Sequence, residues 1–489
     1  MTATSRKSKK ARSVALPTFT LSETCSTQTP GAIARNLPSV GNRGALDYCF
    51  RLKGSQELLD PGDLNRVRQY NLFPIVLDRN ETPWEPATAY LLHRLELLPP
   101  PNMYTVQGIA DDLAAFVEFL SESNLDYTAF PENQRLRPTY RFRGYLIAQV
   151  RDGKIAASTA QRRMGSVIGL YRWLQETDLL TPEYAPWQER DVFLGFKSGN
   201  GTLAILKNKS TDIAIHIPDQ TDPYDPGICD GGKLRPMTRE EQGWMVSTLM
   251  HLRNIEMTLI HLLMLTTGAR IQTALTVRIR HFEAAAPQSA SHIRIRIGPG
   301  TGIDTKNNKR MTLHVPRDIY ERIQAYICSA RAISRRQRAS GGDHSNQHVF
   351  VTQQGAPYYE SKSSLDQYDS SFSLRHRKRG QTVRVFIRDH VLPYIHIHFS
   401  KSFHYQIHDL RASYGMNMSA HLLDQVKHGN ITLANARAVL AKRMGHDHTK
   451  TTDTYLQYQN SREIIFAAID AHEEYIDQLI KSVSEPPCI

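Results

Sequence analysis

This sequence contains few cysteines. It also lacks long apolar runs and nucleotide-binding loops. The five cysteines, at positions 25, 49, 229, 328 and 488, are scattered and form no CxxC spacing. They argue against a disulfide framework or a zinc knuckle and favour a reducing compartment. No apolar run approaches the roughly 20 residues that span a bilayer, so we expect no membrane segment. The sequence also lacks the GxxxxGK[ST] loop that would indicate ATP chemistry.

Acidic residues are fewer than basic ones. The chain has 60 Lys and Arg against 48 Asp and Glu, a formal net charge of +12. This excess favours a polyanionic partner, and nucleic acid is the commonest one. Charge alone leaves a merely soluble basic protein equally open. The length of 489 residues predicts two or three domains.

Changes in composition along the chain suggest where these domains lie. Residues 1–95 are rich in Pro, Gly, Ser and Thr, which predicts an N-terminal arm or extra module that is partly disordered. Residues 96–200 carry apolar residues at helical spacing and predict a helical domain. Proline and glycine cluster in 201–236, the expected linker. Thr238-Arg239-Glu240-Glu241 then predicts a capping box that opens a second domain, 237–489.

The second domain mixes helices with one pair of strands. An apolar helix is expected over 255–266, and alternation predicts antiparallel strands over 292–297 and 311–315. The segment of about 331–400 is basic and is expected to be an irregular insertion, and 462–483 has the spacing of an amphipathic helix. Within the insertion, Ile395 to Phe399 alternates like a strand. The expected fold class is therefore mainly α with a small antiparallel β-sheet (α+β).

Three short motifs follow one another in an order that suits phosphodiester chemistry. They are Thr267-Gly268-Ala269-Arg270, His408-Asp409-Leu410-Arg411-Ala412-Ser413, and Met444-Gly445-His446 with Tyr455 nine positions later. Two guanidinium groups can neutralise a phosphate, and a phenol oxygen can become the nucleophile. A lone arginine is more often a surface ion pair, and a lone histidine a structural residue. The ordered set favours the catalytic interpretation.

These motifs resemble those of the tyrosine recombinase (phage integrase) family, over roughly residues 100–470. The resemblance implies that Arg270 and Arg411 hold the phosphate, that His408 is the general base, that His446 binds the phosphate and that Tyr455 is the nucleophile. Tyr458 is a competing tyrosine, but the nine-residue spacing from His446 favours Tyr455. Thr273 departs from the pattern, because the family usually has an acidic residue three positions after its first arginine. Support for Arg270 must then come from elsewhere.

The turn between the two expected strands carries the candidate proton donors. In the family, a strand pair at this place delivers a lysine that protonates the leaving oxygen. Lys306 is the assignment here, and Lys309 in the same turn is the alternative.

The resemblance also implies an architecture and partners. We expect a two-domain, C-shaped clamp with an N-terminal extension, whose domain 96–200 is the core-binding domain. Its partners would be double-stranded DNA, further copies of the chain in a homotetramer on two DNA sites, and companion recombinases of the same mobile element. The expected location is the bacterial cytoplasm, on the nucleoid. Candidate DNA contacts are basic residues of the helical domain and of the insertion, namely Arg162, Arg163, Arg172, Arg375, Arg377, Lys378 and Arg379.

Neither a metal nor another cofactor is expected. His396, His398, His404 and His408 invite a zinc hypothesis, but no cysteine or acidic ligand accompanies them. The expected activity is site-specific recombination through a 3′-phosphotyrosyl intermediate, as an integrase or a mobile-element recombinase. Two alternatives remain open. One is a type IB topoisomerase-like strand passer that uses the same residues, and the other is a DNA-binding regulator without catalysis.

Overall fold

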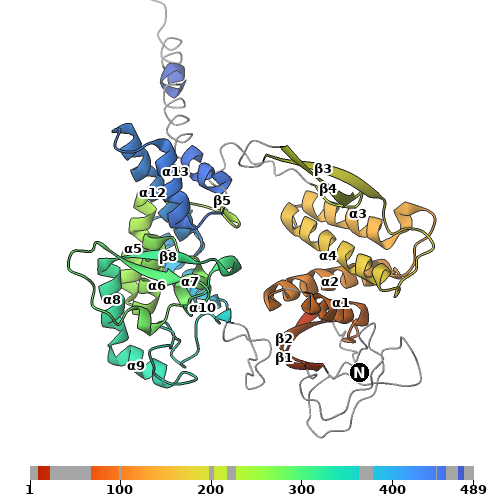
Figure 1. Ribbon diagram of the computed structural model, residues 1–489, viewed down its shortest axis with the longest axis horizontal. Coiled ribbons are helices and arrows are strands. Elements are labelled where there is room, and N and C mark those ends of the chain that lie inside the picture. The colour runs from red at the N-terminus through yellow and green to blue at the C-terminus, as the bar shows by residue number, and fades with distance from the viewer. Residues whose placement is uncertain are drawn as a thin grey trace, which may run out of the picture. The chain divides into compact units, whose positions relative to one another are not determined.

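The structure is a computed structural model that describes residues 9–21, 68–97, 101–197, 203–216, 227–362, 378–447, 449–458 and 472–477. The described residues up to 216 belong to one compact unit, and those from 227 onward belong to a second (Figure 1). Both units are mainly helical, and their sheets are two-stranded and antiparallel. The expected α+β class is confirmed. Among the described residues, no helix has the length and apolar character to cross a membrane.

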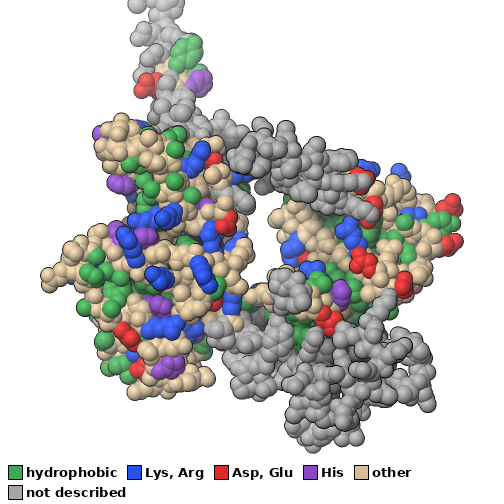
Figure 2. All heavy atoms as spheres, in the orientation of Figure 1, with side chains coloured by type: hydrophobic (Ala, Val, Ile, Leu, Met, Phe, Trp, Pro, Cys, Tyr) green, Lys and Arg blue, Asp and Glu red, His purple; other side chains and the backbone are tan. Residues whose placement is uncertain are grey.

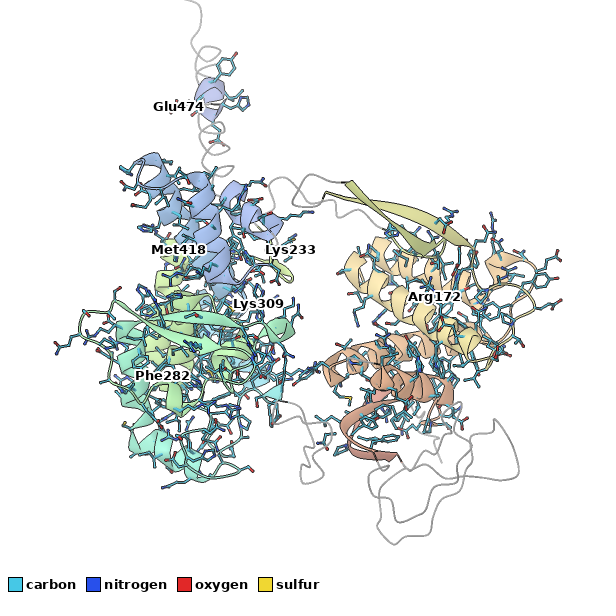
Figure 3. The ribbon with its side chains drawn as sticks, in the orientation of Figure 1. Arg172, Lys233, Phe282, Lys309, Met418 and Glu474 are labelled. Atoms are coloured by element: carbon cyan, nitrogen blue, oxygen red, sulfur yellow. The ribbon has the colours of Figure 1, made fainter. Side chains whose placement is uncertain are left out.

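Unit 1 is a helical bundle with two strand pairs. Its helices are α1 (Glu85–Glu96), α2 (Met103–Ser123), α3 (Pro138–Arg151) and α4 (Ala157–Glu176), and its strands are β1 (Arg12–Leu21), β2 (Arg68–Leu77), β3 (Glu189–Lys197) and β4 (Leu203–Thr211). Buried aromatic residues fill the centre, where Phe116 meets both Phe142 and Tyr171 edge to face. Figure 3 labels Arg172 on α4 of this unit.

The N-terminal segment is part of this bundle where it is described. β1 pairs with β2 antiparallel, although about fifty residues separate them in the chain. Phe19, Tyr70 and Phe73 are buried in the same apolar core as the helices. Glu118 of α2 accepts hydrogen bonds from the backbone of Ala11 and from Arg79. This ribbon therefore stabilises the bundle. Residues 22–67 of the expected arm lie outside the described part.

Unit 2 is built around α6 (Ile255–Thr267), whose residues are mostly apolar and mostly buried, because other elements pack against most of its surface. The other helices of this unit are α5 (Arg239–Leu252), α7 (Ile271–Leu275), α8 (Arg317–Ile327), α9 (Ala330–Gln337), α10 (Gln381–Phe386), α11 (Leu392–His398), α12 (Asp409–Lys427) and α13 (Leu433–Met444). Its strands are β5 (Ile228–Cys229), β6 (Lys233–Leu234), β7 (His292–Ile297) and β8 (Met311–Pro316). Phe282 lies in its core (Figure 3).

Several local expectations for unit 2 are confirmed. Thr238 and Glu241 form both hydrogen bonds of the capping box at the start of α5. α6 ends at Thr267, where expected, and β7 pairs with β8 in an antiparallel register that sets Arg294 opposite His314.

The expectation of a less regular insertion at about 331–400 meets the structure only in part. Residues 338–362 form turns and isolated bridges, whereas other described residues of this segment form α9, α10 and α11. Val349, Phe350, Val383 and Val391 are buried in the main core. The abundance of basic residues concealed the apolar positions between them.

The strand expected from Ile395 to Phe399 is also wrong, because α11 covers most of it. Ile395 is fully buried while Ile397 is 78% exposed. The two isoleucines therefore point to different sides, as residues two apart do on a helix.

Two further expectations meet the structure only in part. Within the expected linker 201–236, residues Leu203–Thr211 form β4, which pairs with β3 along nine residues of each strand. The last described residue before the boundary between units is 216, and the first after it is 227. Of the expected helix 462–483, only 472–477 are described, and they are helical. The domain boundaries themselves stay predictions.

Candidate active site

Four of the six predicted catalytic side chains converge on one carboxylate, that of Asp230. Its Oδ2 atom accepts from Arg411 Nε at 2.7 Å and from the Tyr455 hydroxyl at 3.1 Å. His446 Nε2 lies 3.3 Å from the same oxygen, and Arg270 Nη2 is 3.3 Å from Oδ1. These residues come from chain segments up to 225 positions apart. The structure thus brings together residues from all three sequence motifs.

Arg270 is positioned by the end of α6. Gly268 closes this helix in the left-handed conformation, with φ of 67°, and a Cβ at this glycine would overlap the ring of Tyr414. Arg270 then occupies the residue directly before α7, and its side chain remains 23% exposed. Burial and the neighbouring Arg411 lower its pKa, although Asp230 opposes this. Arginine still keeps its charge at neutral pH.

Arg411 is almost entirely buried on α12 and joins three parts of the chain. Its Nη1 donates to the carbonyl of Gly268 and its Nη2 to the carbonyl of Met444, both at 2.7 Å. Its Nε donates to Asp230. The planar guanidinium fork is suited to this because it offers donors in fixed directions. Arg411 therefore holds the ends of α6 and α13 beside the site.

His446 follows Gly445, which ends α13 in the left-handed conformation. An ionised carboxylate only accepts hydrogen bonds, so Nε2 must carry the proton that points to Asp230. Nδ1 lies 3.0 Å from the hydroxyl of Thr452, which fixes the orientation of the ring. The imidazole also stacks on the ring of Tyr455, with 5.7 Å between the ring centres.

Tyr455 lies within the helical residues 449–458 and is fully buried. Its ring rests on Gly415 of α12, where a Cβ would overlap it. Burial and the charge of Asp230 raise the pKa of the phenol well above its usual range, and Arg411 offsets this only in part. In this arrangement Tyr455 is protonated, and its hydroxyl donates a hydrogen bond to Asp230.

His408 stands directly before α12 and is half-buried. Burial, followed by the positive charges of Arg384 and Arg270, lowers its pKa to about 4. The imidazole is therefore neutral near pH 7 and can accept a proton, as a general base must.

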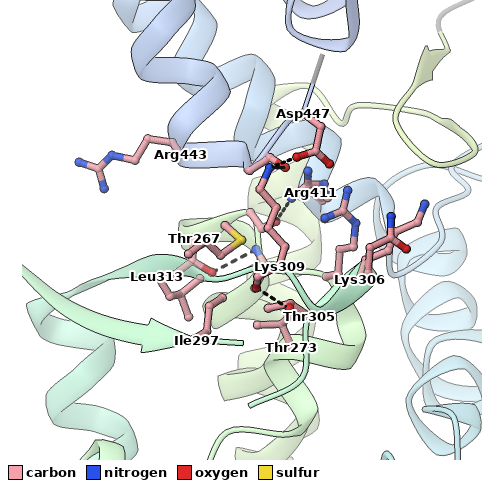
Figure 4. A pocket seen from close by; sticks show the side chains of 16 residues that line it. Thr267, Thr273, Ile297, Thr305, Lys306, Lys309, Leu313, Arg411, Arg443 and Asp447 are labelled. Atoms are coloured by element: carbon pink, nitrogen blue, oxygen red, sulfur yellow. Dashed lines mark hydrogen bonds and ion pairs between the residues drawn. The ribbon is translucent and has the colours of Figure 1, made fainter. Parts of the chain in front are cut away.

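The two candidate lysines differ in their surroundings. Lys309 donates to the carbonyl of Gly445 at 3.0 Å and forms an ion pair with Asp447. Lys306 lies beside the β5–β6 turn, where its Nζ would be 3.2 Å from a Cβ at Gly231. Both line a small pocket next to Arg270 and Arg411 (Figure 4). Its volume of about 40 Å³ holds about three waters, at roughly 10–15 Å³ each.

Asp230 is the site residue that the sequence did not reveal. It belongs to the segment expected to be a linker, and it occupies the turn between β5 and β6. Asp230-Gly231-Gly232 could have indicated a hairpin turn, but no sequence signal connects it with Arg411, 181 positions away. Thr273, which replaces the expected acidic residue, donates instead to the carbonyl of Asp304. Asp230 supplies the carboxylate beside Arg270.

The pKa of Asp230 lies far below its usual range. Burial alone would raise it, but the hydrogen bond from His446 and the charge of Arg411 outweigh burial. The group is therefore an anion at any physiological pH. It is only 3% exposed.

A basic surface lies on the outer face of β7. His292, Arg294 and Arg296 alternate there with residues that point inward, and all three are exposed. Lys442 and Arg443 of α13 lie near enough to this strand pair to affect His314 of β8. Burial, followed by the charges of Arg443 and Arg294, lowers the pKa of His314 to about 4, and Lys442 also contributes. Figure 2 shows Lys and Arg side chains over this part of unit 2. We call this set the β7 basic surface.

The seven predicted DNA contacts are not among the residues of this site or of the β7 basic surface. In unit 1, Arg162 pairs with the buried Asp112, and Arg172 lies over the ring of Trp187. Arg163 is half-buried, as are Lys378 and Arg379 of unit 2. Arg375 and Arg377 lie outside the described residues. The DNA-contact role of all seven stays a prediction.

The histidines behind the zinc hypothesis have other partners. His396 Nε2 lies 2.7 Å from the carbonyl of Phe403, and His398 stacks on Tyr394. No group of three or more potential metal ligands occurs within the described residues.

Comparisons with known proteins return matches only among solved structures. No protein-family model matches the chain, and no curated protein does. One similar structure is the XerH site-specific recombinase bound to a palindromic difH substrate, with 15% identity, a TM-score of 0.42, and coverage of 75% of this chain and 80% of that one. Another is the Tn1549 transposon integrase in complex with circular intermediate DNA, with 12% identity, a TM-score of 0.42, and coverage of 76% and 94%. The same integrase with transposon right end DNA has 13% identity, a TM-score of 0.42, and coverage of 78% and 98%.

Proposed function

We propose that this chain is a site-specific DNA recombinase that cleaves and rejoins strands through a 3′-phosphotyrosyl intermediate. One observation carries the proposal. Arg270, Arg411, His446 and Tyr455 all direct their polar atoms at a single buried anion. Two arginines and an imidazole around an anion form a phosphate site, and a tyrosine hydroxyl in the same place supplies a nucleophile.

The reaction follows from the roles of these groups. The oxygen of Tyr455 attacks the phosphorus while its proton passes to the neutral His408. Charge that develops on the non-bridging oxygens is stabilised by Arg270 and Arg411, a contribution of about 10²–10³ in rate for each such donor. The bond to the 5′ oxygen breaks, and Lys306 protonates this leaving group. The products are a 3′-phosphotyrosyl ester and a free 5′-hydroxyl, and the reverse steps rejoin the strand.

Lys306 is preferred to Lys309 as the proton donor because of their contacts. Lys309 is held by Gly445 and Asp447. The ammonium of Lys306 lies near the turn that carries Asp230, and so close to the anion that the site binds.

Double-stranded DNA is the proposed partner. The net charge of +12 and the β7 basic surface both favour a polyanion beyond the reacting phosphate. Assembly of four copies on two sites, closure of the two units around DNA and cooperation with companion recombinases belong to the same proposal.

The test begins without knowledge of the target sequence. The full-length protein is incubated with sheared genomic DNA from its source, covalent complexes are trapped with denaturant, and the attached DNA is sequenced. A duplex carrying the recovered site, nicked next to the cleaved phosphate, then gives a quantitative substrate. We expect Tyr455→Phe to bind this duplex and to form no covalent complex.

Tyr458→Phe is the matched control, and it should keep forming the complex. A covalent complex with Tyr455→Phe would assign the nucleophile to another residue. Plasmids with one site and with two sites separate the remaining alternative. Exchange between two sites indicates a recombinase, whereas relaxation without exchange indicates a topoisomerase-like enzyme.

A further inference from the structure

The phosphate site is filled by the protein itself. The carboxylate of Asp230 occupies the point toward which the arginines, His446 and Tyr455 direct their donors. Three of the four contacts share Oδ2, and Arg270 contacts Oδ1. An ionised carboxylate resembles a phosphodiester in carrying one negative charge over two oxygens. Asp230 thus presents to these groups the kind of anion that they would bind in DNA.

Tyr455 cannot attack a phosphodiester in this arrangement. Attack requires the phosphorus to lie about 3–3.5 Å from the nucleophilic oxygen. Asp230 Oδ2 already lies 3.1 Å from the Tyr455 oxygen, and Tyr455 is fully buried. The neighbouring pocket of about 40 Å³ has room for only a few waters. Asp230 must therefore leave before a phosphate can enter.

We propose that Asp230 is an internal substitute for the scissile phosphate, and that it keeps the active site closed until DNA displaces it. This inference rests on the proposed function. The carboxylate neutralises one of the two arginine charges and holds Tyr455 in its protonated state. An incoming phosphodiester takes over the same donors, so few hydrogen bonds are lost in the exchange. The site then opens where DNA is bound in register and stays closed elsewhere.

The turn of the β5–β6 hairpin is the part that can move. The strands have two residues each, and their apolar residues Ile228 and Leu234 are buried. Between them the turn is held by one backbone bond, from Asp230 N to Gly232 O. Gly231 has φ of 72°, a conformation open to glycine without strain. Arg411, in contrast, is fixed by two carbonyls. The turn can therefore swing out while the arginines stay in place.

A positioning role is the competing explanation. Asp230 could orient Arg270 and Arg411 during cleavage, replacing the acidic residue that Thr273 does not provide. The two roles predict opposite changes in the rate of cleavage when the carboxylate is removed. Removing a substitute anion accelerates cleavage, whereas removing a positioning carboxylate slows it.

The experiment compares Asp230→Asn with the wild type in the full-length protein. On the nicked duplex, we expect the rate of covalent complex formation to rise at least fivefold in Asp230→Asn, and to saturate at lower DNA concentration. Glu256→Gln is the matched control, because Glu256 is also a buried carboxylate between arginines and a tyrosine, away from the site. It should leave the rate per folded molecule unchanged. A lower rate in Asp230→Asn at an unchanged Tm would overturn the proposal and assign a positioning role.

Inorganic phosphate tests the same inference without DNA. It should raise the Tm of Asp230→Asn and have little effect on the Tm of the wild type, because the wild-type site is already filled. Equal shifts in both proteins would contradict a filled site. If the wild type forms no covalent complex with any DNA, the proposed function fails, while the phosphate result still decides whether Asp230 closes the site.

A third measurement covers the case in which Asp230→Asn does not fold. Cys229 is exposed and adjacent to Asp230. A fluorophore on Cys229, with the other four cysteines replaced by serine, reports on the turn in a protein that retains Asp230. The anisotropy of the label should fall when the nicked duplex is added. An unchanged anisotropy would show that the turn stays in place and would refute the displacement.

Discussion

Two buried carboxylates in the described part of unit 2 each contact two arginines and a tyrosine hydroxyl. Asp230 contacts Arg270, Arg411 and Tyr455. Glu256 contacts Arg331, Arg335 and Tyr326 in the same manner, with Arg331 bound through two nitrogens at 2.8 and 2.9 Å. Burial alone would raise the pKa of both carboxyls, but His446 and Arg411 lower that of Asp230, and Arg331 and Arg335 lower that of Glu256. In both, burial raises the pKa of the tyrosine.

The clusters differ in what holds the carboxylate. Glu256 lies in the first turn of α6, so its backbone is fixed by a regular helix, and its arginines tie α9 to that helix. Asp230 lies at the tip of a hairpin with two-residue strands. The Asp230 cluster also includes the imidazole of His446, whereas the Glu256 cluster consists of two arginines and a tyrosine around the carboxylate. The same charges thus stabilise the fold around Glu256 and form an exchangeable anion site around Asp230.

Replacement of one arginine in each cluster should give the largest contrast in the rate of covalent complex formation. We expect Arg411→Ala to lower the rate of covalent complex formation by at least about 10²–10³, because this arginine is the proposed ligand of the phosphate and also contacts the carbonyls of Gly268 and Met444. Arg335→Ala should lower the Tm and leave the rate per folded molecule unchanged.

Both variants leave a buried carboxylate with fewer partners, so each should lose stability, by roughly 3–5 kcal/mol where the pair is fully buried. Thermal unfolding and single-turnover kinetics on the nicked duplex separate the two effects. A comparable loss of rate in Arg335→Ala would show that the Glu256 cluster is not merely structural.

The contrast also shows which parts of the site could be predicted from the sequence. Arg270, His408, Arg411, His446 and Tyr455 were predicted from short motifs, because each motif places its residue at a helix end or on a helix that local sequence specifies. The β7–β8 pair and the α5 capping box were predicted for the same reason. These are features of local chemistry.

Features that depend on packing across the chain were not predicted. Asp230 joins the site only through the fold, and its sequence context of glycine and proline indicated a linker. The pairing of β1 with β2 and the core positions within 331–400 also rest on contacts between distant segments. Such contacts have no signature in a single sequence.

The low pKa of His408 should appear in the pH dependence of cleavage. The pKa of His408 is lowered to about 4, first by burial and then by Arg384. The neutral general base should therefore persist as the pH falls below 6.5, and the rate of covalent complex formation should stay nearly constant from pH 8 to about 5.5. The unfolded chain binds this proton first, so stability falls as the pH drops from about 6.5 toward 4.

Arg384→Gln sharpens this prediction, because it removes a charge that lowers the pKa of His408. The acid limb of the rate profile should move toward higher pH, with a loss of a few-fold at pH 5.5 and little change at pH 8. Single-turnover rates across this range provide the measurement. A profile that already falls near pH 6.5 in the wild type would mean that His408 is not the base.

The smallest effect is expected for substitutions of charged surface residues that belong to neither cluster. Arg294→Glu and Arg296→Glu, on the β7 basic surface, should weaken DNA binding at every sequence, and each lost phosphate contact should reduce the slope of log K against log salt by about 1. Arg322→Glu is the control, because it is an exposed residue on α8, the helix that carries Tyr326. Binding titrations between 50 and 200 mM salt compare the three variants. Since the β7 basic surface adjoins the site and α8 belongs to the Glu256 cluster, an equal loss in Arg322→Glu would mean that net charge alone governs binding. A loss confined to the β7 variants would show that the β7 basic surface contacts the DNA backbone around the reacting phosphate.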